Sequence, residues 1–189
     1  MATVIIHATV TLDGFMADTD GGVGWMSDVP TVPEDFALVN DVVARIGAVV
    51  GGANREQTVE DGEQPYGGLP GVPVYLMTHR PRPPIEKDGV TYTFVVDDVA
   101  QAVATAEEAA GDRLVSVLGG SIARQCLQLG LVDEIHLDVV PLLLGDGISL
   151  FAGLGRRVEL ERLHTSAYPG GGEAHLRYRV LKPSASPAG

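Results

Sequence analysis

The chain of 189 residues is short of the residues that mark several large classes of protein. It has one cysteine, Cys126, so it cannot form an internal disulfide, and we expect it in a reducing compartment such as the cytoplasm. It has 13 Lys and Arg against 25 Asp and Glu, and its formal net charge of −12 disfavours binding to nucleic acid or to an anionic membrane. No apolar run approaches the ~20 residues that span a bilayer, and we expect no signal peptide.

Several chemical signatures are also missing. The five histidines are scattered, and no pair has a metal-binding spacing such as H-x-x-x-H, so we expect no metal site. The sequence has no P-loop, no G-x-S-x-G motif and no C-x-x-C motif. Because aromatic residues make up only 5%, the core must consist mostly of Val, Leu, Ile and Ala. Cys126 lies among apolar neighbours in a predicted helix, and we expect it in that core.

What the sequence does contain is an alternation of short apolar runs with helical patterns. Strands are expected at residues 4–10, 48–50, 74–77, 91–96, 114–118 and 135–140, and helices at 34–46, 99–110 and 121–129. Two later runs, 158–164 and 174–181, flank a Gly-rich turn and are typical of an antiparallel pair. The pattern predicts a single α/β domain over residues 1–182, with a mostly parallel sheet, antiparallel C-terminal strands and a disordered tail at 183–189.

The segment with the strongest chemical signal runs from a predicted strand through Gly119-Gly120 into a predicted helix. Two glycines let a backbone approach a ligand closely, and the first N–H groups of the helix, near Ser121 and Ile122, suit a pyrophosphate. A tight strand-to-helix turn without a ligand explains the same residues, and the two readings stay open. The segment is not the G-x-G-x-x-G fingerprint.

A second candidate is Thr78-His79-Arg80, which follows a predicted strand and is positive in a negative chain. An Arg there can clamp a phosphate, which would favour NADPH over NADH, although a solvated basic loop is the alternative. Residues 11–33 form a third candidate, a long Gly- and Asp-rich segment that holds Trp25, the only tryptophan. Such a segment can close over a cofactor, or its Trp can pin it to the core.

Four carboxylates qualify as proton carriers, namely Asp13, Asp28, Glu34 and Asp35. Asp35 begins a predicted helix, so it can hold a proton in a dry cleft or simply cap that helix. Asp13 precedes Gly14 and can serve in the same way, or it can make a turn.

Several of these motifs occur in an order that resembles the riboflavin-biosynthesis reductase domain, a branch of the dihydrofolate reductase superfamily. The residues that carry the resemblance are Val10-Thr11-Leu12-Asp13-Gly14-Phe15-Met16-Ala17, Gly119-Gly120-Ser121, the stretch 130–137 (GLVDEIHL) and the stretch 141–147 (PLLLGDG). The resemblance implies a dihydrofolate reductase-like three-layer fold, NADPH as hydride donor, a small-molecule substrate and a homodimer.

The resemblance also assigns roles to individual residues. It places Leu118, Gly119, Gly120, Ser121 and Ile122 at the cofactor's pyrophosphate, Thr78, His79 and Arg80 at its adenosine end, and Gly52 with Arg55 where relatives carry Gly-Arg-x-Thr. It places Asp13, Met16 and Trp25 at the substrate or its lid, and Asp35 as the acid, because a Trp followed by Pro-x-Asp resembles dihydrofolate reductases.

Two departures narrow the expected reaction. Riboflavin-pathway reductases tend to carry Lys after Asp-Gly and Glu before Gly-Gly, whereas this chain has Phe15 and Leu118. Pyrimidine reduction in riboflavin synthesis is therefore not expected. The sequence predicts an NADPH-dependent reductase of a small heteroaromatic substrate, pterin- or pyrimidine-like. A non-catalytic nucleotide-binding protein or sensor is the alternative, and a structural homo-oligomer with a vestigial cleft is the third reading.

Overall fold

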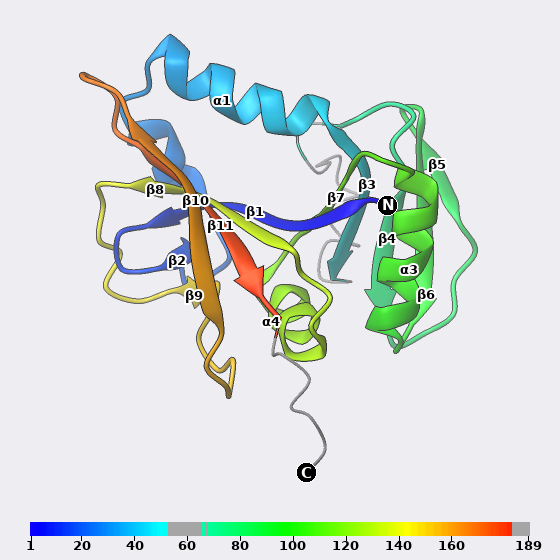
Figure 1. Cartoon of the computed structure of the whole chain (residues 1–189). Coiled ribbons are helices and arrows are strands. Elements are labelled where there is room, and N and C mark those ends of the chain that lie inside the picture. Colours follow the sequence, from blue (N-terminus) through cyan, green and yellow to red (C-terminus); the bar gives the residue numbers. More distant parts are fainter. Residues whose placement is uncertain (53–65, 67, 183–189) are drawn as a thin grey trace.

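A nine-stranded sheet runs through the molecule in the order β10-β11-β8-β1-β7-β3-β4-β6-β5 (Figure 1). The structure is a computed structural model, and it describes residues 1–52, 66 and 68–182. The parallel strands are β1 (Thr3–Thr11), β3 (Ile46–Gly52), β4 (Val74–Thr78), β6 (Val90–Val96), β7 (Leu114–Val117) and β8 (Glu134–Val140). The antiparallel strands are β5 (Ile85–Lys87) at one edge and β10 (Glu159–Ala167) with β11 (Ala174–Leu181) at the other. The predicted α/β fold, with a mostly parallel sheet and antiparallel C-terminal strands, is confirmed.

Helices lie on both faces of this sheet. Helix α1 (Pro33–Ala44) covers one face, and α3 (Val99–Ala110) and α4 (Gly120–Leu129) cover the other (Figure 1). Helix α3 begins where the Asp98 side chain accepts a hydrogen bond from the Gln101 N–H at 2.9 Å, and α4 ends at Gly130 in the left-handed conformation. No helix in the described part of the chain is long and apolar enough to cross a membrane.

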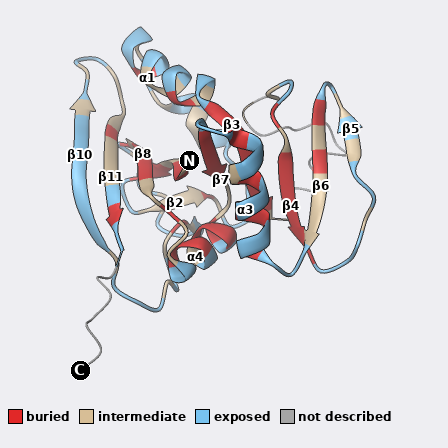
Figure 2. Ribbon diagram, turned by 45° about the vertical axis from the view of Figure 1, so that its right-hand side comes forward, coloured by how far each residue is buried: buried red, intermediate tan, exposed pale blue. Residues whose placement is uncertain are grey.

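The face that α3 and α4 cover holds the main apolar core. Side chains of β1, β3 and β7 pack there against the two helices, and Cys126 is fully buried among them, as predicted. Figure 2 shows buried residues along these strands and on the two helices. The packing follows from the pleat, because alternate residues of each strand point to the same face. Val4, Ile6 and Val10 of β1 therefore all enter this core.

The opposite face is apolar only in part. Ile46, Val49, Leu76 and Tyr92 form one cluster on β3, β4 and β6, and Ile5 with Val42 and Leu114 forms a small one beneath α1. Beside these clusters the alternation places polar side chains against α1, namely His7, Ser116, His136, Asp138 and His175, all buried. This polar layer is the most unusual feature of the fold, because buried polar groups are rare unless they are paired.

The observed elements differ from the predicted ones in three places. The first predicted helix extends too far, because Ile46 already begins β3. Phe36, expected on the apolar side of this helix, is 57% exposed. Strand β5 was not predicted. Within the predicted loop 11–33 the chain forms β2 (Phe15–Ala17) and a 3-10 helix (Gly24–Asp28), and β2 pairs with β9 (Ile148–Ser149). The predicted tail at 183–189 lies outside the described residues.

Candidate functional site

A cavity opens where β1 and β7 separate. The two strands pair as far as Ile6 and Val117. Strand β1 then continues to Thr11, whereas the backbone that follows β7 turns away at Leu118. The resulting cavity has a volume of about 130 Å³. Its lining comes from residues 6–9, residues 117–119, Met16, Val23, Met26 and Leu150. Such an opening at the carboxyl ends of parallel strands is where α/β proteins bind ligands.

The Gly119-Gly120 turn forms one wall of this cavity. Gly119 has φ +86° and ψ 133°, a conformation essentially limited to glycine, and nothing lies within 4 Å of where a Cβ would stand. No described side chain caps the start of α4, so its first N–H groups are available to an anion. Ile122 is buried and lies 3.4 Å from a Cβ built on Gly52, whereas Ser121 is exposed. The structure thus brings together Gly52 and the segment 118–122.

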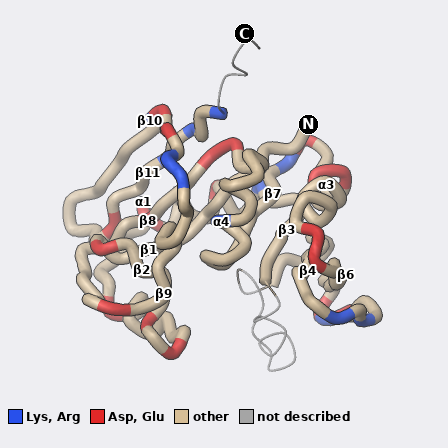
Figure 3. Tube along the Cα trace, turned by 90° about the horizontal axis from the view of Figure 1, so that it is seen from below, with Lys and Arg blue, Asp and Glu red and all other residues tan. Residues whose placement is uncertain are grey.

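The second predicted cofactor segment follows β4. Thr78 is buried and its Oγ1 accepts a hydrogen bond from the Arg80 N–H at 3.2 Å, while the Arg80 side chain is exposed. His79 Nδ1 is paired with Asp97, which offsets part of the local positive charge. Figure 3 shows the basic segment near the ends of β4 and β6. Arg55 lies outside the described residues.

The predicted lid residues are divided between two roles. Met16 lines the cavity. The Asp13 carboxylate instead accepts the Gly145 N–H at 2.8 Å and the Thr11 hydroxyl, so it ties the segment after β1 to the segment after β8. The Thr11 hydrogen bond holds the pKa of Asp13 below its ordinary value. Trp25 is half-buried, and both Met26, the next residue, and Val23, two residues before it, line the cavity.

A chain of hydrogen bonds crosses the polar layer beneath α1. Asp35 Oδ2 accepts the Val32 N–H at 3.0 Å, and Asp35 Oδ1 lies 3.0 Å from His175 Nε2. His175 Nδ1 lies 2.7 Å from Asp138 Oδ1, and the other oxygen of Asp138 lies 3.3 Å from His7 Nε2. Asp35 therefore caps its helix, as considered from the sequence, and also begins this series of hydrogen bonds, while its role as the acid stays a prediction.

The hydrogen-bond pattern requires His175 and its two carboxylates to hold two protons between them. A carboxylate only accepts hydrogen bonds, so each of the two bonds to His175 needs its own hydrogen. Either His175 is an imidazolium between two ionised carboxylates, or it is neutral and Asp35 or Asp138 is protonated. In both cases the group of three carries two protons and a net charge of −1. We call Asp35, His175 and Asp138 the proton-holding triad.

The pKa shifts of His175 and Asp138 agree with this pattern. Burial alone lowers the pKa of His175, but its hydrogen bonds to Asp138 and Asp35 outweigh burial, and the net pKa lies above the ordinary value. Burial alone raises the pKa of Asp138, but the hydrogen bonds from His7 and His175 hold it below the ordinary value. This opposition between burial and hydrogen bonding is typical of charged groups that are paired inside a protein.

At its far end the chain of hydrogen bonds reaches His7 and the β7 side of the sheet. The Tyr66 hydroxyl lies 3.3 Å from His7 Nδ1 and 2.7 Å from Ser116 Oγ, and the rings of Tyr66 and His7 stack with centroids 5.8 Å apart. His136 lies beside them. Burial lowers the pKa of His136, and its Nδ1 has no hydrogen-bond partner among the described residues. Both histidines, with Asp138 and His175, line a hollow of about 10 Å³, the size of one water molecule.

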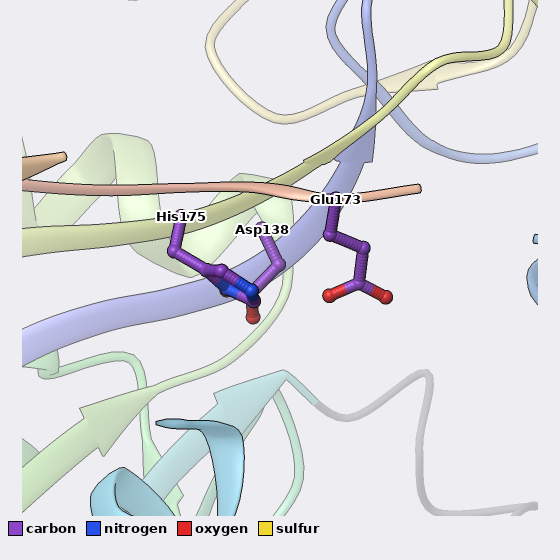
Figure 4. A group of neighbouring side chains, drawn as sticks. All are labelled: Asp138, Glu173 and His175. Carbon is purple, nitrogen blue, oxygen red and sulfur yellow. The ribbon is translucent and has the colours of Figure 1, made fainter. Parts of the chain in front are cut away.

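Three groups of the layer are close enough to suggest a cation site. The nearest ligand atoms of Asp138, Glu173 and His175 all lie within 4.8 Å of one another (Figure 4). Both nitrogens of His175 are already hydrogen-bonded to carboxylates, so neither is free to bind a metal ion. Glu173 adds a third carboxyl group, and burial followed by the charge of Asp138 raises its pKa.

Sequence reasoning found Asp35 but missed its partners. His7, Asp138 and His175 lie on three different strands, and they meet because β11 pairs with β8 so that His175 stands opposite Asp138. One signal was available. His136 and Asp138 alternate within an apolar strand, as do His7 and Thr9, and polar residues at alternate buried positions indicate a polar layer.

Comparison with known proteins places this geometry in context. The sequence profile of the RibD C-terminal domain family matches residues 2–172. The uncharacterised protein YyaP of Bacillus subtilis (strain 168) is 26% identical over 172 residues, which cover 89% of this chain and 90% of that protein. A protein assigned to riboflavin biosynthesis from Shewanella sp. PV-4 aligns in structure with a TM-score of 0.76 and 22% identity, over 96% of this chain and 100% of the other. Dihydrofolate reductase of Enterococcus faecalis, solved with NADP(H) and RAB-propyl, aligns with a TM-score of 0.65 and 14% identity, over 95% and 97% of the two chains. The expected dihydrofolate reductase-like fold is therefore confirmed.

Proposed function

Because the chain belongs to the RibD C-terminal domain family, we propose that it is an NADPH-dependent reductase that transfers a hydride to a small heteroaromatic molecule. One observation carries the proposal. The cavity beside Gly119 and the polar layer beneath α1 meet at His7, which lines both the cavity and the small hollow. A reduction of this kind needs a hydride on one side of the substrate bond and a proton on the other, and the two requirements meet at this place.

The residues of the cavity fit a dinucleotide. The backbone of Gly119 approaches a ligand without hindrance, and the uncapped start of α4 offers N–H groups and a helix dipole to the pyrophosphate. Arg80, exposed after β4, is proposed to hold the 2′-phosphate, with Thr78 shaping the loop and His79 beside it. NADPH would supply the hydride from its nicotinamide, and the protein contributes orientation, exclusion of water and a proton.

The substrate end of the proposal lies beneath α1. The buried triad of Asp35, His175 and Asp138 holds a proton and is linked through Asp138 to His7, which lines the cavity together with Met16, Val23 and Met26. The substrate is proposed to be pterin- or pyrimidine-like. Since Phe15 and Leu118 replace the Lys and Glu of riboflavin-pathway reductases, that pathway's own pyrimidine is not the proposed substrate. A buried, unpaired Cys126 suits a reducing compartment, so we place the reaction in the cytoplasm.

Calorimetric titration with NADPH and NADH tests the cofactor. We expect Arg80→Ala to weaken NADPH binding roughly 10- to 100-fold and NADH binding little, because a charge-assisted hydrogen bond to phosphate contributes about 1.5–3 kcal/mol. Arg157→Ala is the matched control. Arg157 is an exposed arginine just before β10, and it pairs with Glu159, the first residue of that strand. Equal losses for both nucleotides would remove the clamp role of Arg80.

Turnover then separates the reductase from the alternatives. Oxidation of NADPH with members of a panel of pterins, pyrimidines and quinones is the expected result. Binding of NADPH without oxidation by any of them would favour the nucleotide-binding protein or sensor. No binding of either nucleotide would overturn the reductase and leave the structural homo-oligomer.

A further inference from the structure

The proton-holding triad cannot itself touch a substrate. Asp35 is 1% exposed, and both of its oxygens are occupied, by the Val32 N–H and by His175. Neither the cavity nor the hollow includes Asp35 in its lining, within the part of the chain that the structure describes. His175 lines only the hollow and not the cavity. The step from the triad to a bound substrate therefore needs another residue.

His7 is the residue that spans this gap. It accompanies Asp138 and His175 around the hollow and also lines the cavity that Gly119 walls. Its two ring nitrogens face opposite ways. Nε2 meets Asp138 on the β8 side, whereas Nδ1 meets the Tyr66 hydroxyl, which also bonds to Ser116 on the β7 side. The cavity lies on that second side, because it opens between β1 and the end of β7.

Asp138 decides which nitrogen of His7 exchanges a proton. A carboxylate only accepts, so Nε2 must carry a hydrogen to bond to Asp138, in either charge state of the ring. The hydrogen that His7 can release is then the one on Nδ1. A carboxylate that fixes the tautomer of an imidazole and stabilises its cation is a recurrent arrangement in acid–base catalysis.

We propose that His7 is a catalytic residue and that it passes a proton from Nδ1 to the substrate, with Asp138 as its positioning residue. The inference rests on the proposed reductase. A hydride, with its electron pair, leaves the nicotinamide for the carbon of a C=N bond, and the nitrogen of that bond takes the proton from His7. NADPH is thereby oxidised to NADP⁺, the substrate is reduced, and His7 is left neutral with its hydrogen on Nε2. His7 regains a proton from solvent once the product has left the cavity.

Charged groups of both signs lie around His7. The triad, with its net charge of −1, contacts it through Asp138. The other groups that face it are Tyr66, Ser116 of β7, His136 of β8 and Arg177 of β11, which lines the hollow. Burial keeps the pKa of His136 low, so its ring adds no charge near neutral pH. Asp35 and His175 act on His7 only through Asp138.

The pH dependence of hydride transfer tests the assignment. Single-turnover oxidation of NADPH is followed across the pH range, in water and in deuterium oxide, for the wild type, His7→Gln, Asp138→Asn and Asp35→Asn. We expect His7→Gln to slow hydride transfer at least 100-fold and to abolish its decline with rising pH, since general acid catalysis contributes about 10²–10⁴ in rate. Asp35→Asn should keep the wild-type shape of the profile at a lower rate, and Asp138→Asn should shift its midpoint. His164→Gln, an exposed position on β10, is the control.

A profile of His7→Gln that matches the wild type would overturn the assignment, as would a flat profile for Asp35→Asn, which would make Asp35 the donor. Circular dichroism establishes that each variant is folded.

A second measurement needs neither turnover nor a variant that folds poorly. In protein labelled with ¹⁵N-histidine, saturating NADPH should move the ring-nitrogen signals of His7 and leave those of His164 in place. Unmoved His7 signals with NADPH bound overturn this inference while leaving the reductase standing. If calorimetry detects no binding of NADPH at all, the proposed function and this inference fail together.

Discussion

His175 and Asp138 together make the stability of this protein depend on pH from both sides. Its raised pKa contributes stability that is fully present below the ordinary value of 6.5 and is lost as the pH rises through the folded value. The lowered pKa of Asp138 contributes stability that is present above the ordinary value of 3.8 and is lost as the pH falls through the folded value. The free energy of unfolding should therefore be greatest between these limits.

Replacing His175 tests this pair. We expect His175→Gln to lower the free energy of unfolding by about 3–5 kcal/mol near pH 6, because Asp35 and Asp138 are left buried without a cation. Its loss of stability on the alkaline side should disappear. Urea unfolding at several pH values measures both effects. Glu161→Gln, in the exposed pair with Arg179, is the control and should cost under about 1 kcal/mol. An unchanged alkaline limb in His175→Gln would mean that another group titrates.

At the scale of elements, the turn between β10 and β11 reaches over to α1. A Cβ built on Gly171 would stand 2.6 Å from Asp35 Oδ2, and the Gly172 N–H donates to the Pro30 carbonyl at 2.7 Å. The glycine run of this turn thus allows the backbone to pack directly on the carboxylate that begins the hydrogen-bond chain.

Gly171→Ala should therefore act on Asp35 from a different strand connection. We expect a loss of about 1–3 kcal/mol in unfolding free energy, which is typical of overpacking, and a slower single turnover because Asp35 must move away from His175. Gly24→Ala is a fitting comparison, since nothing lies within 4 Å of a Cβ there and its φ is not positive. Equal behaviour of the two variants would show that Asp35 accommodates the methyl group.

Elements with a local signal could be predicted, and elements that depend on distant partners could not. Gly119 and Gly130 mark the limits of α4, and Asp98 marks the start of α3. Helix caps can be predicted because they depend on the residue type at the helix end itself. Strand β5 was missed although Asp88-Gly89, both with positive φ, makes the tight turn that joins it to β6. Strands β2 and β9 have three and two residues, and the two strands that pair lie far apart in the sequence. No local sequence pattern therefore predicts them.

The same division holds for the candidate site. The segment 118–122 and Asp35 were predicted because each lies at the start of a helix, where the sequence carries a signal. The roles of His7 and Asp138 depend on the register of β1, β8 and β11, which only the assembled sheet sets. Asp13 was expected near the substrate, and its carboxylate is held instead by Gly145 and Thr11.

At the scale of the whole molecule, the homodimer implied by family resemblance remains a proposal. The segment Pro141–Leu154 is rich in apolar residues, and the fold divides them: Leu150 is buried, whereas Leu143 is 66% and Ile148 43% exposed. We propose that the exposed pair contributes to the contact between two copies. Sedimentation should then report a dimer for the wild type and a monomer for Leu143→Glu. A monomeric wild type would contradict the proposal, and Leu129→Glu, at an exposed leucine of α4, is the control.

The position of Trp25 has a practical consequence. It is the only tryptophan, and its half-buried indole lies between Val23 and Met26, two residues that line the cavity. All tryptophan emission therefore originates beside the cavity proposed for the cofactor. A bound reduced nicotinamide absorbs where indole emits, so the protein carries an intrinsic optical reporter. Energy transfer from Trp25 should follow cofactor arrival and oxidation in real time, without any attached dye.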